Sequence, residues 1–239
     1  MNNLSLHETK KLFYSEYLYK LEFKNSLNTV FRTELQKGEK LSFARKELDI
    51  LHEQKRNSQP LIKKLWRTDT VITDDDYYDA IDLYKILKAS DEYKLRIDPS
   101  CTITLFSNNK DFLLELGNKL RASSVSFWQP NENHIEFLKN TTKTIIVNTK
   151  PTLPVKIWFN SNRVNKDFAS WIHANSDKCK IGDVALESLE SFGYLNGLYM
   201  FVRDEKVLNL VTLLAGQSIR NVEKLVYKDD IDKYMYGTE

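Results

Sequence analysis

Two short segments in the C-terminal half carry the side chains best suited to meet a ligand. Val155–Phe159 and Leu198–Arg203 each alternate apolar residues with aromatic or basic ones. Because successive side chains of a strand point to opposite faces, the rings and cations of each segment should share one face of a sheet. The residues that this pattern places together are Lys156, Trp158, Tyr199, Phe201 and Arg203.

Such a face suits nucleic acid, because aromatic rings stack on bases and cations neutralise phosphates. Residues 137–180 add a basic environment, with eight Lys and Arg residues against two acidic ones. Arg163 and Lys166, in the polar segment after the first strand, complete the predicted nucleic-acid-binding residues. A competing interpretation, which the packing preferences of aromatic residues favour, is a second buried layer covered by N-terminal helices.

The aspartates that begin at Asp74 are the main acidic feature. Asp74, Asp75 and Asp76 follow Thr73, and two more carboxylates lie within the next six residues. Such a cluster could hold Mg²⁺ or Mn²⁺ for phosphoryl or glycosyl transfer. It also fits a helix start, where Thr73 caps the free N–H groups and the helix dipole favours negative charge. We favour the helix start and predict no metal site.

The motifs of common enzymes are absent from the sequence. There is no GxSxG elbow, no Walker loop and no GxGxxG. A nucleophile pair of His173 and Cys179 is conceivable, but a solvated histidine and a small buried cysteine explain both residues. We therefore predict no catalytic residue and no cofactor, and favour a protein without catalysis of its own.

The elements that position these residues follow from local patterns. Residues 17–24 alternate as a half-buried strand, and Ser42 is a plausible cap for a helix over 42–56. The pattern predicts a hairpin of two strands, 93–97 and 102–106, around a turn that contains Pro99.

From Thr102 onward, a strand that ends in Asn, Ser or Asp and leads into a helix occurs three times, beginning at Thr102, Val155 and Leu198. We therefore predict an α+β fold in which helices pack on one face of mixed sheets, with ferredoxin-like or split βαβ units. The domains expected are an N-terminal α+β lobe over 1–140 and a C-terminal βαβ-type lobe over 141–239.

The function predicted is binding of single-stranded or structured RNA or DNA, without catalysis. The alternatives are a protein–protein interaction or assembly component, acting with a protein partner or as a homo-oligomer, and a metal-dependent nuclease or transferase. The apolar stretches are too short to span a membrane, no secretory signal is readable, and two cysteines without CxxC spacing favour the cytoplasm.

Overall fold

The computed structural model describes residues 4–32, 37–65, 68–90, 92–165 and 167–236. These residues form an α+β structure with eight α-helices, two mixed five-stranded sheets and one small hairpin. The chain separates into two compact units, Met1–Ile135 and Glu136–Glu239. The boundary expected from sequence falls after residue 140.

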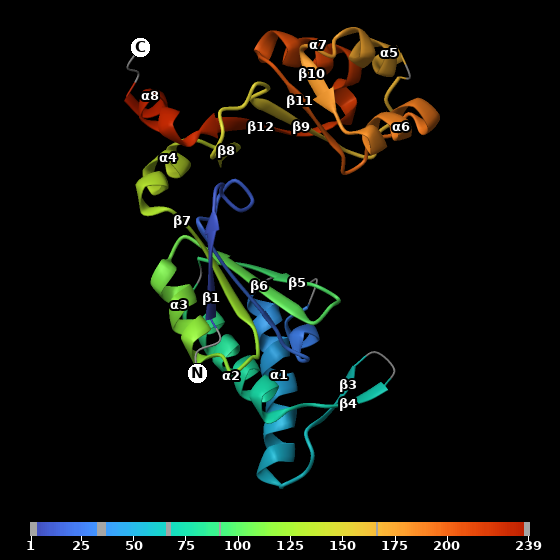
Figure 1. Ribbon diagram of the computed structural model, residues 1–239. Helices are drawn as coiled ribbons and strands as arrows, with labels where there is room; N and C mark the ends of the chain where they lie inside the picture. Colours follow the sequence, from blue (N-terminus) through green and yellow to red (C-terminus); the bar gives the residue numbers. More distant parts are fainter. Residues whose placement is uncertain (1–3, 33–36, 66–67, 91, 166, 237–239) are drawn as a thin grey trace. The chain divides into compact units, whose positions relative to one another are not determined.

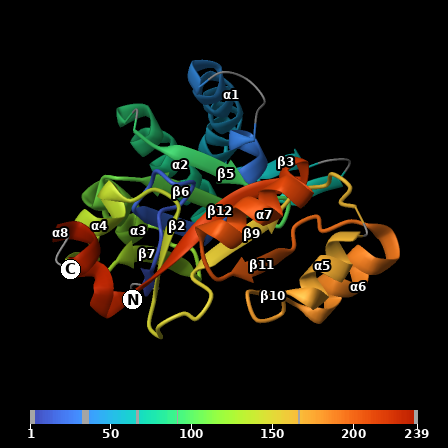
Figure 2. The same ribbon diagram turned by 90° about the horizontal axis from the view of Figure 1, so that it is seen from above.

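The N-terminal unit is built on the sheet β1-β7-β2-β6-β5. Its strands β1 and β7 are parallel, and every other neighbouring pair is antiparallel. Figure 2 shows α1 and α2 on one side of this sheet. The bounds are β1 (Leu4–Thr9), β2 (Tyr19–Lys24), α1 (Lys37–Arg56), β3 (Ile62–Leu65), β4 (Thr68–Val71), α2 (Asp74–Ala89), β5 (Lys94–Ile97), β6 (Thr102–Ser107), α3 (Lys110–Lys119) and β7 (Val125–Pro130).

Alternation along β2 decides which face of this sheet is buried. Tyr19, Leu21 and Phe23 are buried, while Lys20 and Lys24 lie on the opposite face, as the sequence pattern predicts. The helices α2 and α3 begin at the expected caps: the Thr73 side chain accepts from the Asp76 N–H, and Asn109 caps α3 in the same way. The Ser42 cap is wrong, because α1 already begins at Lys37.

The C-terminal unit is built on the sheet β10-β11-β9-β12-β8. Here β8 and β12 are parallel, and the other neighbours are antiparallel. Figure 1 shows α5 and α7 on one side of the sheet, where their apolar residues join those of α6 in one core. The bounds are α4 (Ile135–Asn140), β8 (Thr144–Val147), β9 (Val155–Phe159), α5 (Asp167–Ala174), β10 (Cys179–Ile181), α6 (Asp183–Phe192), β11 (Tyr199–Val202), α7 (Glu205–Ala215), β12 (Ile219–Tyr227) and α8 (Ile231–Tyr236).

The two sheets have the same strand order and the same strand directions. In chain order, β1, β2, β5, β6 and β7 correspond to β8, β9, β10, β11 and β12, and both sheets are arranged first-fifth-second-fourth-third. In the N-terminal unit α3 joins β6 to β7, and β2 lies between these two strands in the sheet. In the C-terminal unit α7 joins β11 to β12, and β9 lies between them in the same way. The chain therefore contains one strand arrangement twice, which the irregular sequence spacing does not reveal. The predicted α+β class is confirmed, whereas a ferredoxin-like topology is not shown.

Candidate nucleic-acid interface

The alternation predicted for β9 and β11 is present, and it separates core residues from face residues. Val155, Ile157 and Phe159 of β9 are buried against the helices, as are Met200 and Val202 of β11. The intervening side chains lie on the opposite face of the sheet, which we call the outer face. They are Lys156, Trp158, Tyr199 and Phe201.

These four side chains form one group, which we call the aromatic–lysine cluster. Lys156 is paired across the strands with Phe201, and Trp158 with Tyr199. The Lys156 ammonium lies 3.9 Å from the centroid of the Tyr199 ring, 4.1 Å from that of Trp158 and 5.7 Å from that of Phe201. At these distances the ring faces attract the cation.

The rings also contact one another in edge-to-face geometry. Tyr199 lies 4.9 Å from Trp158 and 5.4 Å from Phe201, with interplanar angles of 60° and 75°. Tyr199 is 41% exposed, and Lys156, Trp158 and Phe201 are partly exposed. The cluster is therefore not a fully buried second layer, and its rings retain surface on which a flat ligand could lie.

The neighbouring strand β12 contributes residues that the sequence reasoning missed. Glu223 lies opposite Lys156 and is 8% exposed, and one of its carboxylate oxygens accepts a 2.6 Å hydrogen bond from Trp158 Nε1. This bond fixes the indole, because a buried N–H needs an acceptor and Trp has no other polar atom. Only the strand pairing brings Glu223 to this place.

A bulge in β12 brings a further cation to the same face. The register between β12 and β9 shifts between Ile219 and Asn221, so Arg220 is the extra residue. Arg220 and Asn221 line a shallow cavity of about 260 Å³ together with Trp158 and Glu223. On the same face, at the edge of the sheet away from β12, Lys180 of β10 lies opposite Phe201. The outer face thus combines three rings with basic groups on both sides.

The remaining predicted residues lie elsewhere. Arg163 is exposed in the loop after β9, where its backbone pairs with that of Tyr194. Arg203 forms ion pairs with Asp204 at 3.1 Å and with Asp177 at 3.9 Å. Lys166 lies outside the described residues.

Protein partners hold four of the aspartates of α2. Asp74 forms an ion pair with Lys55 at 2.6 Å, and Asp76 accepts a 2.6 Å hydrogen bond from the Ser26 hydroxyl. Asp79 and Asp82 both contact the guanidinium of Arg121. Across the part of the chain that the structure describes, no group of three or more His, Cys, Asp or Glu residues is placed to hold a metal ion.

His173 and Cys179 have separate hydrogen-bond partners. The His173 ring contacts a Glu190 oxygen at 2.8 Å, and the Cys179 thiol donates to the Asn175 carbonyl at 3.3 Å. Burial raises the pKa of the Cys179 thiol, and the nearby charge of Asp177 raises it further. A raised pKa disfavours the thiolate that a nucleophile requires.

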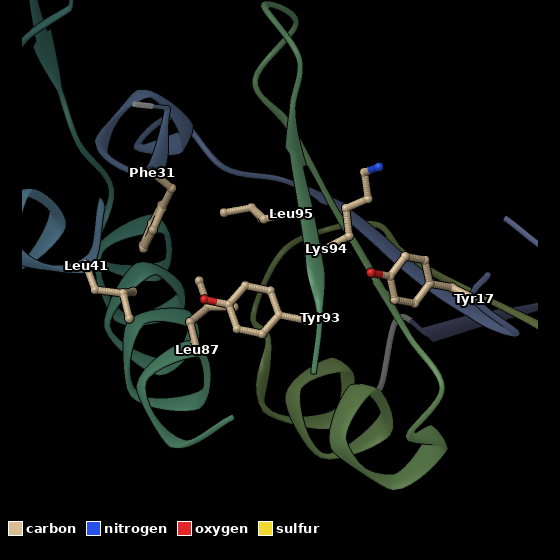
Figure 3. Close-up of a pocket in the computed structure, with 7 residues that line it drawn as sticks. All are labelled: Tyr17, Phe31, Leu41, Leu87, Tyr93, Lys94 and Leu95. Carbon is tan, nitrogen blue, oxygen red and sulfur yellow. The ribbon is translucent and has the colours of Figure 1, made fainter. Parts of the chain in front are cut away.

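A cavity of about 340 Å³ lies in the N-terminal unit beside the edge strand β5 (Figure 3). Its described lining is mainly apolar, with the side chains of Tyr17, Tyr93 and Lys94 as the polar contributions. These groups can hold an apolar moiety but offer no carboxylate or imidazole for acid–base chemistry. The remaining lining residues are Phe31, Leu41, Leu87 and Leu95.

Comparisons with protein families, with curated proteins and with solved structures each give no match. Within the described ranges, no helix is both long enough and apolar enough to cross a membrane.

Proposed function

We propose that the protein binds single-stranded RNA or DNA through the outer face of the C-terminal sheet, without catalysing a reaction. The observation that carries this proposal is the Lys156 ammonium among three partly exposed rings on two adjacent strands. A base can stack on such rings while the cation meets a neighbouring phosphate. Base–aromatic stacking contributes about 1–3 kcal/mol per base, so two occupied rings would contribute about 2–6 kcal/mol, to which phosphate contacts add.

We also propose that each unit is a ferredoxin-like domain with one added parallel edge strand. Four strands of each unit support this, because their order in the sheet and their antiparallel neighbours match that topology. The chain adds elements to it: α6 lies between β10 and β11, and α1, β3, β4 and α2 lie between β2 and β5. In this arrangement β9 and β11 are the two central strands. Sheet-based RNA-binding domains stack bases on aromatic residues of such a sheet.

Binding of labelled oligonucleotides tests the proposal. Fluorescence polarisation with 12-nucleotide single-stranded DNA and RNA should show affinity that falls steeply as salt rises. Phe201→Ala and Trp158→Ala should each weaken binding about 5- to 100-fold, which corresponds to the loss of about 1–3 kcal/mol of stacking. Phe192→Ala is the matched control, because Phe192 is an exposed ring on α6, outside the cluster. If the wild-type protein shows no binding at low salt, or the cluster variants bind as it does, the proposal fails.

A second candidate function is assembly with another copy of the chain. The specific observation is that Leu210, Leu213 and Leu214 of α7 are exposed, although Val207 and Val211 of the same helix are buried. Leucines at this spacing form one apolar stripe on a helix. Light scattering should then give a dimer mass that Leu213→Asp reduces to that of a monomer, whereas a monomeric wild-type protein would exclude this function.

We further propose a cytoplasmic location. Its support is that both cysteines are free thiols, Cys101 exposed and Cys179 buried, which suits a reducing compartment. Thiol labelling of protein isolated from its native cells, with and without prior reduction, tests this location.

A further inference from the structure

The outer face of the N-terminal sheet repeats the main features of the aromatic–lysine cluster. The correspondence of the two sheets makes Lys20 of β2 the counterpart of Lys156 of β9. In register, Lys20 lies opposite Phe106 just as Lys156 lies opposite Phe201. Each phenylalanine precedes by three residues the cap of the next helix, Asn109 or Asp204.

This first outer face also carries rings beside cations. The Lys20 ammonium lies 3.3 Å from the centroid of the Trp128 ring, and Trp128 stacks on the exposed His7 with a centroid separation of 4.8 Å. The register places Lys94 of β5 opposite Phe106, and Arg96 opposite a threonine two residues earlier. Lys20, Lys24, Lys94 and Arg96 share this face. Glu22 forms an ion pair with Lys20 at 3.3 Å and Asp98 one with Arg96 at 3.0 Å, so cations still outnumber carboxylates and the charge suits a phosphate backbone.

A segment of the chain itself occupies part of this face. Within the connection from β1 to β2, residues 12–18 form a closed loop, which we call the strap, held by two backbone hydrogen bonds between Phe13 and Tyr17. Phe13 lies 5.5 Å from the Phe106 ring, and Tyr14 lies 5.0 Å from it in edge-to-face geometry. Lys94 lies 3.7 Å from the centroid of Tyr14. Phe106 is consequently only 4% exposed.

The strap reaches this position with backbone strain. Tyr14 and Ser15 both adopt the left-handed region, with φ of 55° and 60°. This region is unfavourable for residues with a Cβ, and a Tyr and a Ser there must be held by surrounding contacts. Tyr14 remains 49% exposed. A strained, half-exposed segment that fills a basic aromatic face is a segment that a ligand could displace.

We infer that the outer face of the N-terminal sheet is a second binding face for single-stranded nucleic acid, and that the strap occupies it in the unliganded protein. The inference rests on the proposed function for its ligand class, and the face's own charge favours nucleic acid over a peptide. The corresponding connection in the C-terminal unit, residues 148–154, contains two prolines and no aromatic residue. The strap is thus a feature of one copy only.

The experiment compares the oligonucleotide affinity of strap variants with that of the parent protein from which they are made, in the polarisation assay. The parent is Lys156→Ala/Phe201→Ala, in which the proposed face of the C-terminal unit is disabled. Adding Phe13→Ala/Tyr14→Ala should raise the affinity of this parent for a 12-nucleotide single strand at least fivefold. Tyr14→Ala alone, which removes a half-exposed ring, should give a smaller gain and covers the case in which the double change unfolds the unit.

Controls assign the gain to the face. Tyr78→Ala removes an exposed tyrosine on α2 and should give no gain. Lys94→Ala/Trp128→Ala, added to the strap variant, should abolish the gain. If folded strap variants bind no better than their parent, or the gain survives the loss of Lys94 and Trp128, the inference is overturned.

The proposed function is judged separately, by whether Lys156→Ala/Phe201→Ala binds less tightly than the wild-type protein. A gain on opening the strap therefore supports the second face even where the first face proves inactive. Binding of an aromatic peptide in place of the oligonucleotide by the strap variants would contradict the ligand class and so overturn the inference.

Discussion

The buried carboxylate of Asp79 offers the sharpest test of how the aspartates of α2 are used. Asp79 is 1% exposed and accepts hydrogen bonds from the backbone N–H groups of Arg121 and Ala122, at 2.8 and 2.9 Å. The Arg121 guanidinium adds a third bond at 3.2 Å. Burial raises the pKa of Asp79, and the bonds from Arg121 and Ala122 offset part of that rise. These contacts tie α2 to the end of α3.

Asp79→Ala should destabilise the N-terminal unit by about 2–6 kcal/mol. The change leaves two backbone N–H groups without an acceptor, and each such loss costs about 1–3 kcal/mol. The ion pair adds little, because the Arg121 side chain is 42% exposed and keeps Asp82 at 3.0 Å. Asp82→Ala is the matched control, and it should cost less than about 1 kcal/mol because its partner stays solvated.

Urea denaturation measures the total loss of unfolding free energy, and amide hydrogen exchange shows which elements lose protection. Exchange should accelerate in α3 and β6 of Asp79→Ala and stay unchanged in β9, because the two units have separate cores. Mg²⁺ should leave the loss of stability unaltered. A cost below about 1 kcal/mol, or equal costs for Asp79→Ala and Asp82→Ala, would refute the reasoning from unsatisfied donors. A Mg²⁺-dependent gain that Asp74→Ala removes would instead support the metal-dependent alternative.

Four further predictions concern the aromatic–lysine cluster and the two cysteines. Glu223→Gln keeps an acceptor for the Trp158 N–H but removes a negative charge beside Lys156, so oligonucleotide affinity should rise severalfold in the polarisation assay; weaker binding would contradict this. Lys156→Ala should reduce the slope of log affinity against log salt by about one, whereas Lys206→Ala, an exposed lysine on α7, should leave the slope unchanged. In the native protein a thiol reagent should modify exposed Cys101 quickly and buried Cys179 only on unfolding. Burial raises the pKa of the Cys179 thiol in the folded protein above 9.0, the ordinary value. The contribution of this thiol to the free energy of unfolding is therefore fully present below pH 9.0 and is lost as the pH rises through the folded-state pKa. Between pH 8 and pH 10, urea titrations should show a smaller loss of unfolding free energy for Cys179→Ala than for the wild-type protein.

Local patterns predicted the parts of the fold that depend on local interactions. The alternation of β9 and β11 needs only neighbouring residues, and so does capping by Thr73 and Asp204. The start of helix α1 was harder to predict, because a charged segment shows no clear apolar start. The helix begins at Lys37, before the expected cap. The rings and Lys156 could be found from sequence because one period-2 pattern placed all of them on one face.

The rest of the candidate site depends on pairing between distant strands. Glu223 is 65 residues from Trp158 in the chain, and only the register of β12 against β9 brings its carboxylate to the indole. The bulge that brings Arg220 to the same cavity adds a residue to a strand without leaving a sequence signal of its own. A strand period predicts the face of a side chain, but it does not predict the neighbour across the sheet.

The repeated strand arrangement explains why one outer face is covered and the other retains exposed rings. In both units the connection between the first and second strands begins at the same place in the topology. In the N-terminal unit this connection is the strap, whose Phe13 and Tyr14 contact Phe106. In the C-terminal unit it contains Pro151 and Pro154, which restrict the backbone and supply no ring for Phe201. The composition of this one connection therefore separates a copy of the face whose phenylalanine is buried from a copy whose rings stay partly exposed.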